Sequence, residues 1–282
     1  MPERAGVEHR HKEVTTPGDK SQRNNQSFRV LGKEEARRYR GVTARLNYLG
    51  QDRSDIQNAA KELSKAMANP EEVDMTKAKR VARYLKGKPR FVMRYEYQDK
   101  PVGLTVWTDT DFAGCSKTRK STSGGLVMHG THVIKSWSTN LVVIALSSGE
   151  AEYYGMVKGA SVALGIKALS EDLGRQYEEP IEIKTDASAA IGIANRIGVG
   201  KVRHIEVNQL WLQGKVHRKE IKITKVKGEE NLADALTKPL DQRGVLRHIE
   251  GVRARIEQGR HPLMPKADYC LEDEWDATES NE

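Results

Sequence analysis

The sequence predicts an α/β fold in which a small helical region precedes a five-stranded mixed sheet with flanking helices. The first observation behind this prediction is a change of period. Apolar residues recur every three or four positions up to residue 88, and every second position after Pro101. The second observation is the order of the elements expected after Pro101, which is βββαβααβα. A meander followed by alternating helices and strands is typical of a mixed sheet covered by helices.

The helical region spans residues 33–88 and consists of three expected helices. They are separated by Gly50 and by Asn69-Pro70, which are residues that interrupt helices. The apolar face of the first helix is formed by Tyr39, Val42, Leu46 and Leu49. The third helix turns a basic face to solvent.

After Pro101, apolar residues alternate with polar ones as in strands. Strands are expected at residues 102–107, 124–130, 132–138, 181–185 and 220–226. Helices are expected at residues 148–173, 187–196 and 204–217, and a last helix opens at residues 232–236.

The chain has 282 residues, and we expect four segments. They are a disordered linker (1–32), the helical region (33–100), the sheet domain (101–240) and an extension with an acidic tail (241–282). No run approaches 18 apolar residues, and the N-terminus lacks the apolar segment of a secretory signal. Two cysteines cannot form a disulfide framework. We therefore expect an intracellular protein with no membrane partner.

The charge balance indicates a polyanionic partner. Lys and Arg number 47 against 39 Asp and Glu, which gives a net charge of +8. An excess of basic residues favours nucleic acid above other partners. The alternative is that these residues form ordinary solvated helix faces.

Four carboxylates fall at the ends or edges of expected core elements. Asp109 and Asp186 close two strands, Glu152 lies in the first turns of the long helix, and Asp234 begins the last helix. If the two strands are neighbours, their ends bring Asp109 and Asp186 together. Oxygen-only clusters of this kind bind hard divalent cations, and a pair of such ions assists phosphodiester hydrolysis.

Each carboxylate also has a structural explanation. Asp186 and Asp234 lie where helices begin and are suited to capping, while Glu152 fits a solvated helix surface. Asp111 competes with Asp109, because residues two apart on a strand share a face. Glu150 competes with Glu152, but Ser147-x-x-Glu150 fits a capping box in which Glu150 binds the backbone N–H of Ser147.

The motifs around these carboxylates resemble the ribonuclease H domain at the C-terminal end of the Pol polyprotein of Ty1/copia-type retrotransposons. The matching motifs, in order, are Trp-Thr-Asp109-Thr-Asp, Arg119-Lys-Ser-Thr-Ser-Gly, Leu-Ser-Ser-Gly-Glu-Ala-Glu152-Tyr, Thr-Asp186-Ala-Ser-Ala-Ala, Arg-His204-Ile-Glu and Asn-Leu-Ala-Asp234-Ala-Leu-Thr-Lys-Pro. Residues 33–88 are similar to the helical end of that family's reverse transcriptase. The resemblance covers residues 33–240.

The resemblance implies an RNase H-like fold and Mg²⁺-dependent cleavage of the RNA strand of an RNA–DNA hybrid. It implies that Asp109, Glu152, Asp186 and Asp234 are catalytic and hold two Mg²⁺ ions, with Mn²⁺ as a possible substitute. The expected partners are the hybrid and the rest of the Pol polyprotein. The Tyr-x-Asp-Asp motif of the polymerase is absent from the sequence, so we expect no polymerase activity from this chain alone.

Two groups of residues are candidates for nucleic-acid binding. The residues are Arg119, Lys120, Ser121 and Thr122 after the first strand, and Lys79, Arg80 and Arg83 on the third helix. For the first group, a polar loop without contacts is the alternative. His204 opens a helix, where a structural role is favoured over a nucleic-acid contact.

Other functions stay open at this point. One alternative is a catalytically inactive or recruited remnant that binds nucleic acid without cutting it. Another is an integrase- or resolvase-like nuclease of the same superfamily. The presence of all four carboxylates favours the enzyme over the remnant.

Overall fold

The fold is described from a computed structural model, which describes residues 14–19, 28–115, 118–200, 205, 209–259 and 261–263. The helices are α1 (Lys33–Leu49), α2 (Ser54–Ser64), α3 (Glu72–Gly87), α4 (Ser148–Asp172), α5 (Ser188–Ala194), α6 (Trp211–His217), the 3₁₀ turns η2 (Gly228–Glu230) and η3 (Asp234–Leu236), and α7 (Gln242–Gly251). The strands are β1 (Arg90–Met93), β2 (Leu104–Asp111), β3 (Thr122–His129), β4 (His132–Asn140), β5 (Ile181–Thr185), β6 (Ile221–Lys225) and β7 (Ala254–Glu257).

The central sheet has five strands in the order β4-β3-β2-β5-β6. The pairs β2–β3 and β3–β4 are antiparallel, whereas β2–β5 and β5–β6 are parallel. This mixed sheet with flanking helices confirms the predicted fold class. Because β2 and β5 are parallel neighbours, their C-terminal ends lie at the same edge.

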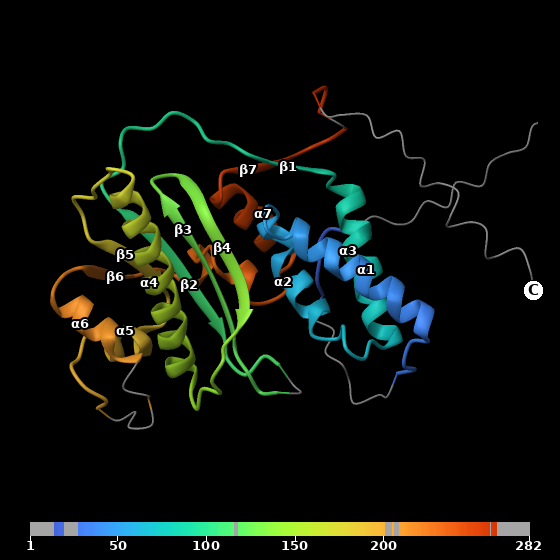
Figure 1. The fold of residues 1–282 in the computed structure, drawn as a ribbon, viewed down its shortest axis with the longest axis horizontal. Coiled ribbons are helices and arrows are strands. Elements are labelled where there is room, and N and C mark those ends of the chain that lie inside the picture. The colour runs from blue at the N-terminus through green and yellow to red at the C-terminus, as the bar shows by residue number, and fades with distance from the viewer. Residues whose placement is uncertain are drawn as a thin grey trace, which may run out of the picture.

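Helices α4, α5 and α6 lie on one face of the sheet, opposite the helical region α1–α3 (Figure 1). Two glycines let α4 approach β2 closely. A Cβ atom at Gly159 would come within 2.7 Å of Thr108 Cγ2, and one at Gly155 within 2.4 Å of Thr110 Oγ1. The first turns of α4 therefore lie against the C-terminal end of β2.

The opposite face of the sheet is covered by elements from both ends of the chain. Leu126 of β3 and Leu236 of η3 share a buried cluster with Tyr39 and Tyr84 of the helical region and Ile249 of α7. Helices α1–α3 therefore pack into the same core as the sheet and the C-terminal elements. The predicted domain limits at residues 32, 100 and 240 stay a prediction.

Three features differ from the expectations. The helix expected from Leu232 is a single 3₁₀ turn, because Pro239 lacks a backbone N–H and disfavours helix in the preceding residue. Helix α6 begins at Trp211, later than expected. Strands β1 and β7 form a two-stranded antiparallel sheet that the sequence did not reveal. In the described part of the chain, no helix has the length and apolar character needed to span a membrane.

Candidate active site

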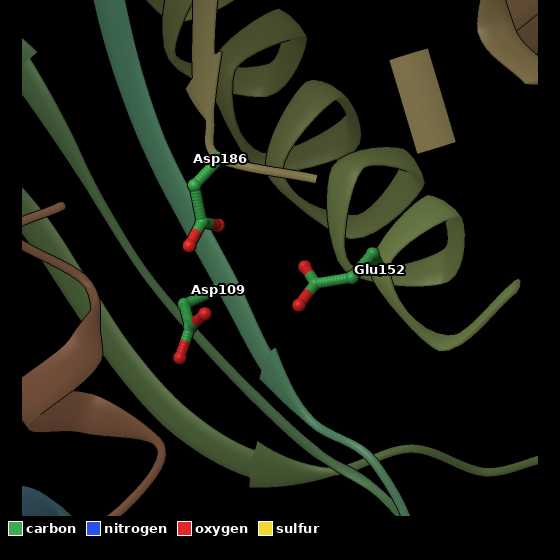
Figure 2. A group of neighbouring side chains, drawn as sticks. All are labelled: Asp109, Glu152 and Asp186. Atoms are coloured by element: carbon green, nitrogen blue, oxygen red, sulfur yellow. The ribbon is translucent and has the colours of Figure 1, made fainter. Parts of the chain in front are cut away.

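Three carboxylates converge at the edge of the sheet. Asp109 comes from β2, Asp186 follows β5, and Glu152 projects from α4. One oxygen of each lies within 4.8 Å of an oxygen of the other two. Figure 2 shows the three side chains close together, with the Glu152 carboxylate directed toward the two aspartates. Asp109 and Asp186 meet because their strands are parallel neighbours, as expected from the sequence.

The start of α4 separates Glu150 from Glu152. Ser147 caps the helix by accepting a hydrogen bond from the backbone N–H of Glu150 at 3.2 Å. The Glu150 carboxylate accepts one from the backbone N–H of Leu146 at 2.9 Å, one residue before the partner expected from a capping box. Glu150 is therefore bound at the helix start, whereas Glu152 faces the aspartates.

The carboxylates of this site are desolvated and repel one another. Burial raises the pKa of Glu152 to about 9, and the charges of Asp109 and Asp186 act in the same direction. Burial also raises the pKa of Asp109 to about 7, with a further contribution from the charge of Asp234. A hydrogen bond from Thr237 and the charge of Lys238 oppose this shift at Asp109.

The donor set fits a hard divalent cation. One oxygen of Glu152, Oε2, is buried and has no hydrogen-bond partner. It lies among carboxylate oxygens, which Mg²⁺ and Mn²⁺ prefer as ligands. A cation at this position would give Glu152 Oε2 a partner and relieve the repulsion among the carboxylates. The residues that would hold it are Asp109, Glu152 and Asp186.

Asp234 is not part of this group of three. Its Oδ1 atom forms an ion pair with Lys238 Nζ at 2.9 Å. Its negative charge nevertheless acts on Asp109 strongly enough to raise the pKa of that residue. Asp234 therefore lies beside the cluster, held by a lysine one turn away.

Two residues of the loop around Asp234 support the cluster. The Thr237 hydroxyl donates a short hydrogen bond to Asp109 Oδ2. Asn231 Nδ2 donates to the carbonyl of Thr108 at 3.0 Å and lies 3.5 Å from Asp186 Oδ1. Neither Asn231 nor Thr237 was predicted from the sequence to contact these carboxylates. Their only signal was their position in the motif that contains Asp234.

Asp111 points to the same side as Asp109 but has other neighbours. It pairs with Thr122 across β2 and β3. Burial raises its pKa, while the charges of Lys61, Lys238 and Lys65 oppose the shift. Among the described residues, the cluster of three includes Asp109 and not Asp111.

The loop residues proposed to bind nucleic acid divide into two pairs. Arg119 is exposed and Lys120 is partly exposed. Ser121 and Thr122 are buried, and their hydroxyls accept hydrogen bonds from the Ala113 backbone N–H at 3.0 Å and from Lys61 Nζ at 2.7 Å. In this loop, Arg119 and Lys120 thus offer the accessible surface.

The basic residues of α3 lie on a helix that packs against α1 and α2. Lys79 is exposed, and Arg83 is partly exposed. Arg80 Nη2 donates to the Thr16 hydroxyl at 2.9 Å, and its Nη1 lies 3.7 Å from the Asp19 carboxylate. A segment near the N-terminus therefore occupies Arg80. His204 lies outside the described residues.

Comparison with known proteins identifies relatives of this chain. No family model matches it. Over 206 residues, or 72% of its length, it is 32% identical to a retrovirus-related Pol polyprotein from transposon RE1 of Arabidopsis thaliana. Over 188 residues, or 66% of its length, it is 31% identical to that from transposon TNT 1-94 of Nicotiana tabacum. Its homologues are retrovirus-related Pol polyproteins of copia-type transposons.

These relatives confirm the resemblance found in the motifs. The chain spans about 14% of the length of each of these two Pol polyproteins. Among solved structures, the chain is similar to the N-terminal ribonuclease H domain of a Mycobacterium tuberculosis protein. The identity is 17% and the TM-score 0.34, over 53% of this chain and 97% of that one.

Proposed function

We propose that this chain is the ribonuclease H part of a copia-type Pol polyprotein, and that it hydrolyses the RNA strand of RNA–DNA hybrids with the help of Mg²⁺. The observation that carries the proposal is the convergence of Asp109, Glu152 and Asp186 around a buried carboxylate oxygen without a partner. Homology to transposon Pol polyproteins supports the same assignment.

In this proposal, Asp109, Glu152, Asp186 and Asp234 hold two Mg²⁺ ions, for which Mn²⁺ can substitute. When bound, such ions supply a more acidic attacking water and stabilise the leaving 3′ oxygen. The products carry a 5′ phosphate and a 3′ hydroxyl. The chain alone carries no polymerase activity, because its sequence lacks the Tyr-x-Asp-Asp motif.

The residues around the four carboxylates have distinct parts in this proposal. Thr237 orients the Asp109 carboxylate by its hydrogen bond, and Asn231 holds the loop of Asp234 against the end of β2. Lys238 restrains Asp234 through their ion pair. Arg119 and Lys120 contact the hybrid backbone at the exposed end of the β2–β3 connection, and Lys79 and Arg83 contact it on α3.

The proposal is tested with an RNA–DNA hybrid labelled on either strand. Incubation with the chain in Mg²⁺ should shorten the RNA strand and leave the DNA strand whole, and EDTA should stop the reaction. Duplex DNA and duplex RNA serve as control substrates. Binding of the hybrid without cleavage in Mg²⁺ or Mn²⁺ would favour the alternative, a nucleic-acid-binding remnant. Cleavage of duplex DNA would favour an integrase- or resolvase-like nuclease.

A further inference from the structure

Lysines from outside the sheet lie at the edge of the candidate active site. Lys61 belongs to α2 in the helical region, Lys65 caps the C-terminal end of that helix, and Lys238 follows η3. The positive charges of all three act on Asp111, and that of Lys238 acts also on Asp109 and Glu152. Cations and carboxylates therefore lie side by side where β2 ends.

The position of Lys61 is fixed by contacts with the sheet. Its Nζ atom donates a hydrogen bond to Thr122 Oγ1 at 2.7 Å, and its side chain is 11% exposed. Thr122 pairs with Asp111 in the sheet, and Asp109 lies two residues before Asp111 on the same face. Two residues of a strand span about 6.6–6.8 Å. The Lys61 ammonium is thus held a short distance from the carboxylate cluster.

Helix α2 is anchored on the loop that carries Asp234. Asn58 Nδ2, one turn before Lys61, donates a hydrogen bond to the carbonyl of Leu236 at 3.3 Å. At the start of the helix, the Ser54 hydroxyl is bonded to His248 Nε2 at 2.8 Å. These contacts join α2 to η3 and α7. Lys61 and Lys65 therefore keep their position relative to Asp109.

Lys61 and Lys65 share one carboxylate, that of Glu62 in α2. Lys61 forms a short ion pair with Glu62 Oε1, and Lys65 Nζ lies 2.7 Å from the same oxygen. The Lys65 side chain is 22% exposed, twice the exposed fraction of Lys61. Lys61, Lys65 and Glu62 together therefore carry a net charge of about +1. This positive charge lies at a place where carboxylates alone would repel a phosphate.

We propose that Lys61 and Lys65, together with Lys238, bind backbone phosphates of the nucleic acid next to the bond that is cut. The helical region then supplies part of the substrate-binding surface of the nuclease. This inference rests on the proposed function for the identity of the substrate. Phosphate contacts position a nucleic acid without reading its sequence, so the site would accept hybrids of any sequence.

The test uses the full chain and a fluorescent hybrid whose RNA strand is fully 2′-O-methylated, so that binding is measured without cleavage. Anisotropy titrations in Mg²⁺ over a range of KCl concentrations give Kd and its salt dependence. In the variant Lys61→Gln/Lys65→Gln, Kd should rise about threefold to tenfold per lysine, as for exposed to partly buried ion pairs. The slope of log K against log salt should fall by up to about 0.9 per lost contact, the value for B-DNA. With a cleavable hybrid, KM should rise and kcat should stay within about twofold of the unmodified chain.

Lys167→Gln is the matched control. Lys167 is also a partly exposed helix lysine beside a glutamate, Glu171, at 3.9 Å. It lies 15 residues after Glu152 on α4, or about 22 Å along the helix. This variant should bind and cleave the hybrid as the unmodified chain does.

Thermal melting shows whether each variant is folded. If the double variant does not fold, Lys65→Gln alone gives the answer, because Lys65 lies at the C-terminal end of α2 and is more exposed than Lys61. Lys61→Arg, which keeps the positive charge at position 61, should bind the hybrid about as the unmodified chain does. A folded variant with unchanged Kd and unchanged salt slope would overturn the phosphate site while leaving the proposed function intact. The lysine variants could instead bind the hybrid more weakly while the unmodified chain never cleaves the natural hybrid. That result would support the phosphate site and overturn the proposed function.

Discussion

Glu150 and Glu152 lie two residues apart on α4, but only the Glu150 carboxylate is bound to the backbone at the start of the helix. The Glu150 carboxylate accepts a hydrogen bond from the backbone N–H of Leu146, whereas Glu152 Oε2 is buried without a partner beside Asp109 and Asp186. One glutamate therefore supports the start of the helix, and the other faces the candidate metal centre.

This difference predicts a clean separation of two variants. Glu150→Gln keeps an acceptor oxygen, so it should retain hybrid cleavage and lose at most about 1 kcal/mol of unfolding free energy. Glu152→Gln should lose cleavage and keep a cooperative melting transition. Cleavage rates and thermal melts of both variants check this. Loss of cleavage in Glu150→Gln alone would indicate that Glu150, and not Glu152, is the metal ligand.

The raised pKa of Glu152 predicts how stability depends on pH in the absence of metal. In the folded chain the pKa of Glu152 is about 9, so Glu152 keeps its proton at lower pH. In the unfolded chain its pKa has the ordinary value of 4.5. Between these values the folded state binds more protons, so the free energy of unfolding falls as pH rises. Glu152→Gln removes the contribution of Glu152 to this dependence and leaves that of Asp109. Its melting temperature should match that of the unmodified chain near pH 5 and exceed it by several degrees near pH 8.

Mg²⁺ should weaken the pH dependence of the unmodified chain, because ligand carboxylates bind it in their charged form. Melting curves at both pH values, with Mg²⁺ and with EDTA, measure this effect. An identical pH profile in Glu152→Gln and the unmodified chain would show that Glu152 titrates normally.

The hydrogen bond from Thr237 to Asp109 predicts a positioning role for this threonine. Thr237→Val should lower the free energy of unfolding by about 1.5–3 kcal/mol, because a buried carboxylate loses a donor. It should also raise the pKa of Asp109, so cleavage at pH 7 should fall more than cleavage at pH 9. Thr237→Ser keeps the hydroxyl, so its free energy of unfolding and its ratio of cleavage at pH 7 to cleavage at pH 9 should match those of the unmodified chain. A parallel loss at both pH values would indicate a structural role only.

Neutralising the basic face of α3 tests the second group of predicted nucleic-acid contacts. Changing Lys79, Arg80 and Arg83 together to Gln should weaken hybrid binding for every sequence and flatten its salt dependence, with kcat nearly unchanged. Because Arg80 contacts Thr16 and Asp19, the triple variant must be compared with Arg80→Gln alone. An unchanged salt slope would mean that this face is only solvated.

The sequence predicted the parts of the site that depend on strand order and helix period. Asp109 and Asp186 meet because β2 and β5 are parallel neighbours, and α4 covers Ser148–Asp172, close to the expected 148–173. Both features follow from local patterns and from a general rule of sheet topology.

Other parts depend on contacts between distant segments, which a single sequence does not reveal. Lys61 meets Thr122, and Asn58 meets Leu236, across long stretches of chain. The pairing of β1 with β7 joins residues 90–93 to residues 254–257. Strands of four residues give little periodic signal, so this pairing was not predictable. The place of α2 beside the site depends on contacts between residues far apart in the sequence, and it was not predictable either.

The most direct test of the central claim is single-turnover cleavage of an RNA–DNA hybrid in Mg²⁺ by the unmodified chain and by Asp186→Asn. Asn at this position keeps the shape of the side chain and removes the charge that a cation would bind. We expect the unmodified chain to release RNA fragments with 5′ phosphates and 3′ hydroxyls, and the folded variant to release none. Equal cleavage rates for the two chains would contradict the assignment of this carboxylate cluster as the metal centre of a ribonuclease H.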